Sequence, residues 1–510
     1  MKNIKYISIL IVVTLATIIT SCSKEWLEVE PIGKSDVDSY YQTDEEISMG
    51  LIAAYDMLHS DFFDDWSSWS FVKQLPSDGT NCGGGGESDQ AQYQKIDDFD
   101  WTAENVGIRK FFHWLYHGVS RSNLVINKSV VSSDLSARYV AEAKVLRALY
   151  YFELTTWFGD VPLRLEYAKN LVEAKERTPQ AEVWAQIEKD LAEAIPVLPD
   201  KNNFPNNDID KFRVHKQAAQ ALLGKAHLYQ GEWSAALTQF EAIIAQEGVL
   251  VGLETNFADV TKKETEWGIE SLLEASFISE NNTWGTVQWN RQANDNRHIQ
   301  LSGPRGPWEG GTSGINAGWG FMPPTAKLYN AYDAADTIRR LNTIISNAEL
   351  QSRYGGNFTD GWDTEGMVRT KYTTFESETN MDGVATPELN YGTNWRLIRY
   401  ADVLLMAAEA YYRDGNEGEA RTQLNKVRAR ADVEDVTATG TDLFDAIVNE
   451  RQVELAYEGH RFRDLVRWGL ANQELASLGF EAGKHEFFPI PLDEINSNPG
   501  ISPDDQNPGY

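Results

Sequence analysis

The sequence contains few cysteines, few histidines and few basic residues. Among 510 residues there are two cysteines, Cys22 and Cys82, and eight histidines. If Cys22, directly after a predicted leader, carries lipid, Cys82 has no partner. We then expect no intrachain disulfide, so that the core alone stabilises the fold. Lys and Arg number 46 against 76 Asp and Glu, a net charge of -30. A surface this acidic argues against nucleic acid and anionic lipid as partners.

The N-terminus lacks an apolar run long enough to span a bilayer. Residues 7–19 are apolar, thirteen positions, whereas a spanning helix needs about twenty. Lys2 and Lys5 before this run, and the small residues Thr20 and Ser21 after it, are typical of a secretory signal peptide. Cys22 at the predicted cut resembles the cysteine of a lipobox, so we expect residues 1–21 to be removed and the Cys22 thiol to be lipidated. A plain signal peptide followed by an unmodified cysteine is the alternative.

Two stretches share the spacing of tetratricopeptide repeats, in which small residues on one helix face an aromatic on the next. They are Leu223-Gly224-x-x-His227 with Ala236-x-x-x-Phe240, and Ala407-Ala408-x-x-Tyr411 with Ala420-x-x-x-Leu424. A looser pair joins 141–162 to 181–198, and 105–127 is a candidate for another helix. Because such repeats bury their apolar faces only by stacking, we predict a mainly α, tetratricopeptide-like frame over about 40–250 and 325–470.

The helical pattern is interrupted by two long segments rich in Trp, Gly, Asn and Thr, residues 251–324 and 352–395. They are too long for simple connections and too aromatic for disorder. We expect irregular, folded insertions which, together with 61–104, form a loop-rich ligand face on the frame.

The stretch 77–93, SDGTNCGGGGESDQAQY, is rich in glycine but does not have the sequence of a phosphate loop. Such a loop needs Lys and Ser or Thr directly after its glycines. Glu87 and Asp89 follow instead, and two carboxylates would repel phosphate. We expect this loop to shape the rim of a site for a different ligand.

The C-terminal part carries two specific motifs. They are Glu450-Arg451-x-x-Glu454-Leu455-Ala456-x-Glu458-Gly459-x-Arg461-Phe462-x-Asp464-Leu465-x-Arg467-Trp468 and Phe488-Pro489-Ile490-Pro491-x-x-Glu494-Ile495-x-x-Asn498-Pro499-Gly500. With them the chain resembles the SusD/RagB family of surface glycan-binding lipoproteins. The resemblance runs nearly end to end and includes Trp26-Leu27, Pro31, Glu142-Ala143 to Tyr151, Gly159-Asp160-Val161-Pro162, and Pro323-Pro324-Thr325 ahead of Asp336 and Arg339-Arg340.

The resemblance implies one SusD-like domain over 22–510, anchored by lipid at the outer-membrane surface. It also implies a non-catalytic role, in which the frame docks on a TonB-dependent, SusC-like transporter and the irregular face captures oligosaccharide for import. The chain departs from the family pattern at Asp333 to Arg340, an imperfect Asp-x-Arg element, and at His227, where a Tyr is expected. Both departures fall on the predicted frame.

Three acidic residues of the first motif recur at four-residue steps. Glu450, Glu454 and Glu458 have Arg451, Arg461 and Arg467 nearby, a spacing that predicts ion pairs along one helix face. A catalytic acid and base would need a cleft and separated pKa values. We favour the structural interpretation.

A sugar site needs flat aromatics for C–H faces and amides, carboxylates or guanidinium groups for hydroxyls. Tryptophans at helix-periodic positions, Trp157, Trp184, Trp233 and Trp468, fit a core, and Trp319 fits the framework. The insertion candidates are Trp284, Trp289, Arg291, Asn294, Arg297 and Trp308. The resemblance adds residues of the loop after the first helices, namely Trp66, Trp69, Asp78, Asn81 and Tyr93.

No cofactor is expected. His113 and His117 are spaced as two ligands on one helix face, but Trp114 stands where a zincin has Glu. The acidic run Asp97-Asp98-x-Asp100 could hold Ca²⁺ but lacks the spacing of a known loop. Two other functions stay open, a glycoside hydrolase and a helical-repeat scaffold for a protein or peptide. The sequence tells neither which glycan is bound nor whether Cys82 is buried.

Overall fold

The computed structural model describes residues 37, 39–59, 69–167, 174–204, 207–286, 294–305, 309–311, 314–357 and 361–510. Its α-helices are α2 (Asp44–Tyr55), α3 (Trp69–Gln74), α4 (Ala91–Asp97), α5 (Val106–Lys128), α6 (Asp134–Phe158), α7 (Gln180–Ala194), α8 (Asn207–Asp210), α9 (Lys216–Gln230), α10 (Trp233–Ile244), α11 (Arg297–Ser302), α12 (Ala326–Ala331), α13 (Thr337–Leu341), α14 (Asn347–Tyr354), α15 (Tyr400–Arg413), α16 (Glu417–Arg430), α17 (Gly440–Glu454), α18 (Arg461–Trp468), α19 (Ala471–Leu475) and α20 (Leu492–Ser497). Its strands are β1 (Ser271–Ala275), β2 (Glu309–Gly311), β3 (Ile344–Ser346), β4 (Gly355–Asn357), β5 (Met367–Arg369) and β6 (Trp395–Arg399).

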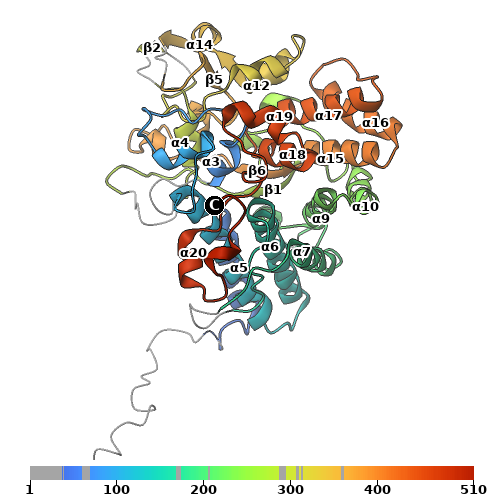
Figure 1. Ribbon diagram of the computed structural model, residues 1–510. Coiled ribbons are helices and arrows are strands. Elements are labelled where there is room, and N and C mark those ends of the chain that lie inside the picture. Colours follow the sequence, from blue (N-terminus) through green and yellow to red (C-terminus); the bar gives the residue numbers. More distant parts are fainter. Residues whose placement is uncertain are drawn as a thin grey trace, which may run out of the picture.

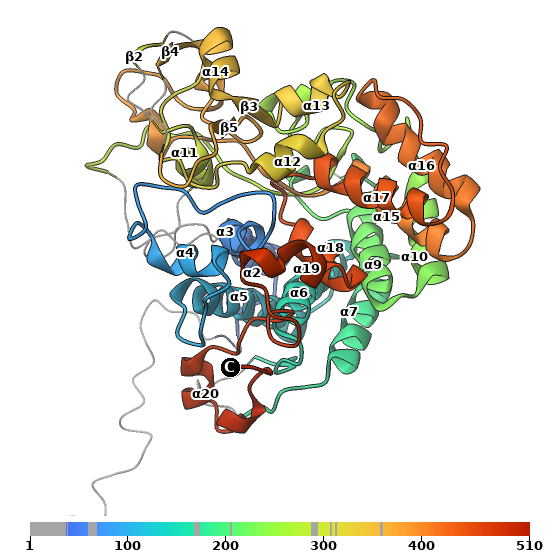
Figure 2. The ribbon, with the colours of Figure 1, turned by 45° about the horizontal axis from the view of Figure 1, so that its top comes forward.

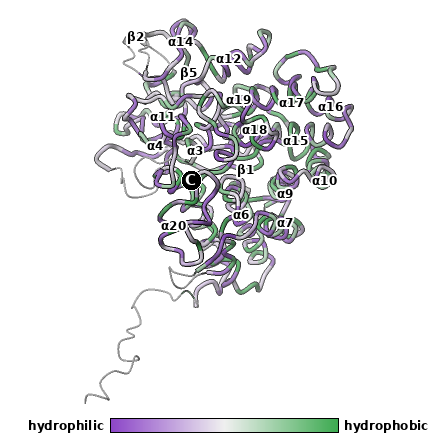
Figure 3. Tube along the Cα trace, viewed as in Figure 1, coloured by the Kyte–Doolittle hydropathy of each residue, from purple (hydrophilic) through white to green (hydrophobic). Residues whose placement is uncertain are grey.

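The longer helices stack one on the next in a curved row. α5 packs on α6, α6 on α7, α7 on α9, α9 on α10, α10 on α15, and α15 on α16 and α17. Figures 1 and 2 show this row running from α5 to α16 along one side of the molecule. Along the outer helices α16 and α17, hydrophilic and hydrophobic segments alternate, as expected for helices with one buried face (Figure 3). The predicted tetratricopeptide-like frame is confirmed.

Small residues allow these helices to approach closely. Gly224 of α9 lies against the ring of Phe240 in α10, where a Cβ would be 2.8 Å from Cδ1 and 2.9 Å from Cζ. Gly118 of α5 faces Tyr150 of α6 in the same way, with a Cβ 2.6 Å from Cδ2. The predicted pair 218–244 therefore packs through the glycine and the aromatic that its spacing singled out.

Helix α6 is the centre of the N-terminal half. Ser133 caps it by accepting a hydrogen bond from the Ser136 amide at 3.0 Å, and its hydroxyl also donates to Asp44 of α2 at 2.8 Å. Most of the helix is buried, since α2, α5, α7 and α9 all contact it. Among its buried residues is Trp157, 1% exposed, and Trp184 of α7 is also in the core.

The segments between the helical blocks are irregular and carry short antiparallel strand pairs. β1 pairs with β6, β2 with β4, and β3 with β5. The β1–β6 pair joins residues just after the first helical block to the strand that leads into α15. The insertions are thereby tied to the frame at their ends.

The C-terminal tail returns to the first helices. Phe488 stacks on Trp157 with ring centroids 5.0 Å apart, and the Asn507 side chain donates to the Phe158 carbonyl oxygen at 2.9 Å. The Trp101 indole N–H donates to the Tyr510 hydroxyl at 2.5 Å. In Figures 1 and 2 the C-terminus accordingly lies near α20 and α5, within the body of the molecule.

Candidate functional site

Two irregular segments that are far apart in the sequence meet through side-chain amides. The Phe277 N–H donates to Asn394 Oδ1 at 2.7 Å, and Asn390 donates to the Asn282 carbonyl at 3.0 Å. Gly392 lies so close that a Cβ there would be 2.6 Å from the Ser279 nitrogen. In Figures 1 and 2 the first of these segments, the yellow-green loop after β1, projects on the side opposite α10 and α16. The amides fix a loop surface away from the outer helices.

Trp284 lies on this paired-loop surface. The residue is 46% exposed, and its indole N–H donates to Glu388 Oε1 at 2.6 Å. Ile278, Met381 and Val384 of the same two segments are also exposed. One ring edge is held by a carboxylate while much of the ring faces solvent, an arrangement suited to stacking on the C–H face of a sugar.

The glycine loop lies against residues 318–324. Gly83 bridges Phe321 and Thr80 bridges Pro324. Gly83 has φ 70°, and a Cβ there would be 2.5 Å from Pro323 Cδ, so the position requires glycine. Cys82, within the loop, is fully buried, and burial with the nearby Asp97 raises the pKa of its thiol.

A second exposed tryptophan borders the glycine loop. Trp362 is 46% exposed, its backbone N–H donates to the Gly84 carbonyl at 3.4 Å, and its indole N–H donates to Gln94 Oε1 at 3.2 Å. Asn81 donates to the Asp363 carbonyl oxygen beside it at 3.1 Å. The glycine loop therefore lies beside an aromatic residue, Trp362, which belongs to the 352–395 insertion. Trp362 was not among the ligand residues predicted from the sequence.

Three predicted ligand residues have buried side chains. Asp78 accepts from Arg461 Nη2 at 2.8 Å and from Lys327 Nζ at 2.8 Å. Burial raises the pKa of Asp78, but hydrogen bonds from these two cations outweigh it and lower the pKa below its usual value. Tyr93 is 1% exposed and stacks on Phe71 at 4.8 Å, and Arg297 pairs with Asp295 at 3.1 Å inside α11 and its approach. Asn81 and Asn294 are at least partly exposed.

The other predicted positions lie outside the described residues. They are the lipidation residue Cys22 and the ligand candidates Trp66, Trp289, Arg291 and Trp308. Trp69 begins α3, and its side chain is not described.

The motif glutamates form a buried ionic network. Glu454 is paired with Arg430, with Arg399 at 3.1 Å and with Arg339 at 3.3 Å. Glu458 is paired with Lys371 and with Arg399 at 2.7 Å. The expectation of ion pairs along one helix face was wrong in its geometry: α17 ends at Glu454, and the partners come from other elements. The motif arginines instead meet Asp402, Asp464, Asp78 and Glu409.

The network fits a structural role better than catalysis. Burial raises the pKa of both carboxyls, but the surrounding cations dominate, holding Glu454 well below its usual range and lowering the pKa of Glu458 to about 2. A carboxyl that stays ionised at neutral pH is a poor general acid.

Among the described residues, one cluster of side chains has the composition of a metal site. One group has ligand atoms within 4.8 Å of one another, Glu188, His227 and Glu232. Protein groups already engage two of its oxygens, since Gln230 donates to Glu188 at 2.7 Å and His227 Nδ1 lies 2.6 Å from Glu232. No described helix has the length and apolar character needed to cross a bilayer.

Comparisons with known proteins agree with this architecture. One family model, described as the SusD family, matches residues 342–510, and another, described as starch-binding associating with outer membrane, matches 25–228. SusD-like protein P2 of Formosa agariphila is 25% identical over 541 residues, covering 100% of both chains. The structure of surface glycan-binding protein A from Bacteroides thetaiotaomicron in complex with laminarihexaose has a TM-score of 0.78 and 26% identity, covering 91% of this chain and 99% of that one.

A solved laminarin binding SusD-like protein is more similar still. It has a TM-score of 0.81 and 32% identity, and the match covers 92% of this chain and 100% of that one. Together with the two family models, this whole-length similarity shows that the chain belongs to the SusD/RagB family.

Proposed function

We propose that the protein binds oligosaccharide or polysaccharide at the cell surface through its loop-rich face and delivers it to a TonB-dependent outer-membrane transporter. The observation that carries the binding role is Trp284, a half-exposed ring whose indole N–H is fixed by Glu388 on a loop surface held by amides. A surface built in this way is ordered before ligand arrives, so binding loses little conformational freedom.

Trp362 extends the same proposal to the glycine loop. Its ring is as exposed as that of Trp284 and is likewise oriented by a side-chain oxygen, from Gln94. Asn281 and Asn294 are exposed and Asn81 is partly exposed, and their amides are suited to hydrogen bonding with sugar hydroxyls. Trp66, Trp69, Trp289, Arg291 and Trp308 remain candidates for the same face.

Laminarin is the first ligand to test, because two similar proteins are named for binding laminarin or laminarihexaose. If each ring contributes about 0.5–1.5 kcal/mol, taking aromatic pairing as a guide, loss of one ring weakens binding roughly 2- to 12-fold.

The experiment is isothermal titration of the soluble chain lacking residues 1–22 with laminarihexaose, laminarin and soluble starch. We expect saturable heat with one glycan class, weakened by Trp284→Ala and by Trp362→Ala. Val249→Ala, which removes an exposed side chain just after α10, is the control and should bind as the parent does. If both tryptophan variants bind glycan with the affinity of the parent, the glycan site does not lie on this face.

The same titrations test the hydrolase alternative. Incubation of the protein with the bound glycan overnight, followed by measurement of reducing ends, should give no product above a protein-free control. Steady release of reducing ends would make the protein an enzyme.

Anchoring and delivery need separate tests in cells. We propose that Cys22 is lipidated, so Cys22→Ala should move the protein from the membrane fraction to the soluble fraction. Delivery predicts that the full-length protein co-purifies with a TonB-dependent transporter from detergent-solubilised outer membranes. If no such transporter co-purifies with the protein, the proposed delivery step is contradicted, whereas the proposed glycan binding is not.

A further inference from the structure

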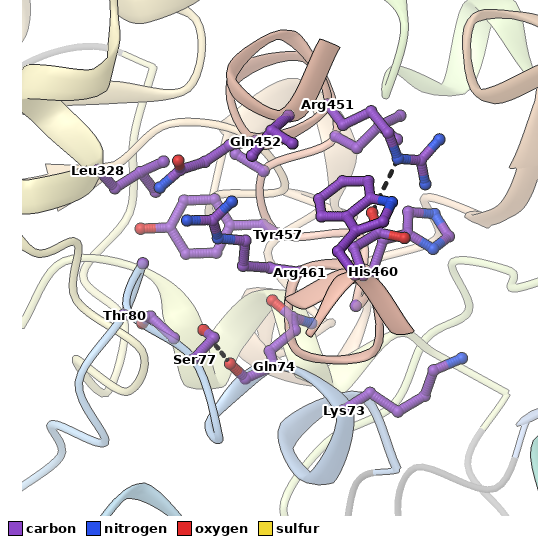
Figure 4. Close-up of a pocket in the computed structure, with 17 residues that line it drawn as sticks. Lys73, Gln74, Ser77, Thr80, Leu328, Arg451, Gln452, Tyr457, His460 and Arg461 are labelled. Atoms are coloured by element: carbon purple, nitrogen blue, oxygen red, sulfur yellow. Dashed lines mark hydrogen bonds and ion pairs between the residues drawn. The ribbon is translucent and has the colours of Figure 1, made fainter. Parts of the chain in front are cut away.

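A small cavity lies where α3 and the loop after it meet α17 and α18 (Figure 4). Its volume is about 40 Å³, room for about three water molecules. Among the residues that line it are Gln74, Leu328, Arg451, Gln452, Tyr457 and Arg461. The residues proposed above to bind glycan do not line this cavity.

Several polar atoms in the cavity lining are buried without a protein partner. They are Arg451 Nη2, Gln452 Nε2 and Arg461 Nη1, which are donors, Gln74 Oε1, which is an acceptor, and the Tyr457 hydroxyl, which can be either. Buried polar groups in folded proteins almost always have partners. Five such atoms on residues around one cavity therefore indicate that a bound species satisfies them.

The remaining atoms of both guanidinium groups are fixed by acidic side chains. Arg451 donates to Asp402 and to Asp464, both at 2.8 Å, and Arg461 donates to Asp78 at 2.9 and 2.8 Å. In Figure 4, Gln452 and Arg461 lie on the side of Leu328 and Tyr457, whereas Gln74 approaches from α3. The donors are held in place by the fold before any ligand binds.

The numbers of donors and acceptors among these atoms indicate which chemical groups the ligand carries. Three of these atoms only donate, one only accepts and the Tyr457 hydroxyl can do either, so the ligand must offer mainly acceptor oxygens. An ionised carboxylate offers acceptors alone. Two of the donors belong to guanidinium groups, which bind carboxylates through strong, charge-assisted hydrogen bonds. His460 in the same lining is neutral, because burial and Lys225 lower its pKa to about 3. A hydroxyl next to the carboxylate would donate to Gln74 Oε1.

We propose that this cavity is a binding site for a small hydroxycarboxylate, separate from the glycan-binding face. The carboxylate oxygens accept from Arg461 and Gln452, and the hydroxyl donates to Gln74. Leu328 and the ring carbons of Tyr457 form the apolar walls. The size of the cavity limits the ligand to about five non-hydrogen atoms.

The test uses the soluble chain lacking residues 1–22, with glycolate, acetate and the neutral acetate analogue acetamide as probes. We expect saturable glycolate binding in the millimolar range, with acetate weaker and acetamide at least roughly tenfold weaker than acetate, because it lacks the charge. Gln452→Leu removes one donor at similar volume and should weaken glycolate binding at least roughly fivefold. Gln351→Leu, on the exposed face of α14, is the matched control and should leave binding unchanged.

A crystal structure of the protein soaked with glycolate provides a second readout that does not depend on the variants. Density for glycolate between Gln74, Gln452 and Arg461 would support the proposal. Density for water alone at concentrations up to about 50 mM, or equal affinities of Gln452→Leu and the parent, would overturn it. Both results are independent of glycan binding, so a failure here leaves the proposed function untouched.

Discussion

Replacing Gly224 by alanine should destabilise the protein, although alanine is the better helix former. In the interior of a helix, glycine to alanine normally stabilises by about 1 kcal/mol. At Gly224, however, the new Cβ would lie 2.8 and 2.9 Å from two carbons of the Phe240 ring, closer than real Cβ contacts allow. Overpacking of this kind costs about 1–3 kcal/mol, and because more than one ring atom is involved we expect a net loss of about 1–2 kcal/mol.

Gly418 provides the matched control. It lies in α16, is exposed, and a Cβ there would meet nothing nearer than Asn416 Oδ1 at 3.6 Å. Gly418→Ala should therefore stabilise by up to about 1 kcal/mol. The two variants should differ in sign, with a gap of about 2–3 kcal/mol.

Scanning calorimetry measures this difference. Unfolding entropy is about 2.1 cal/mol/K per residue, which for a chain of this size gives a Tm change on the order of 1 °C per kcal/mol. We expect Gly224→Ala to melt about 2–3 °C below Gly418→Ala. If both variants raise Tm equally, the close approach of α9 and α10 does not prevent a larger side chain at Gly224. Adding Phe240→Leu to Gly224→Ala should recover part of the loss, since a smaller side chain makes room for the Cβ.

Three further predictions concern other parts of the molecule. The pKa of Glu458 is lowered from 4.5 to about 2 in the fold, so its ion pairs contribute about 3 kcal/mol of stability above pH 4.5. This contribution is lost as the pH falls toward 2. The Tm of Glu458→Gln should therefore decline less steeply with falling pH than that of the parent, and parallel curves would contradict this. The Cys82 thiol, buried and with a raised pKa, should not react with a thiol reagent at neutral pH until denaturant is added, and prompt reaction of the native protein would show an open loop. Ser133→Ala should lower Tm by about 1 °C through loss of the α6 cap, whereas Ser132→Ala, at an exposed neighbour, should not change it.

Local spacing was sufficient to predict the frame. Gly224 and Phe240 both lie within one stretch of 27 residues, 218–244, and their contact follows from two helices joined by a short turn. The same logic located α15 and α16, and the apolar character of Trp157 and Trp184 placed them in the core. These features depend on neighbours in the sequence, which periodicity reports directly.

The site was less predictable because its partners are distant in the sequence. Asp78 and Tyr93 flank the glycine loop and were assigned to a ligand rim, yet Asp78 is paired with Arg461, and Tyr93 stacks on Phe71. Trp362 stands in an Asp-Gly-Trp-Asp run without the Asn and Arg neighbours that drew attention to Trp284. Its candidacy depends on Gly84 and Gln94, which are distant in the sequence and contact it in the fold. The glutamate network likewise joins Glu454 to Arg339, Arg399 and Arg430, from three other elements.

The return of the C-terminal tail to the first helices has a consequence for how the protein is made. Trp157 of α6 is covered by Phe488, and the Trp101 indole N–H donates to the Tyr510 hydroxyl. Until residues 488–510 have been synthesised, the N-terminal helices lack part of their own core. A chain that stops early therefore leaves large aromatic rings exposed, a feature that proteases and chaperones can recognise. The N-terminal helices therefore complete their core only after residues 488–510 have been added to the chain.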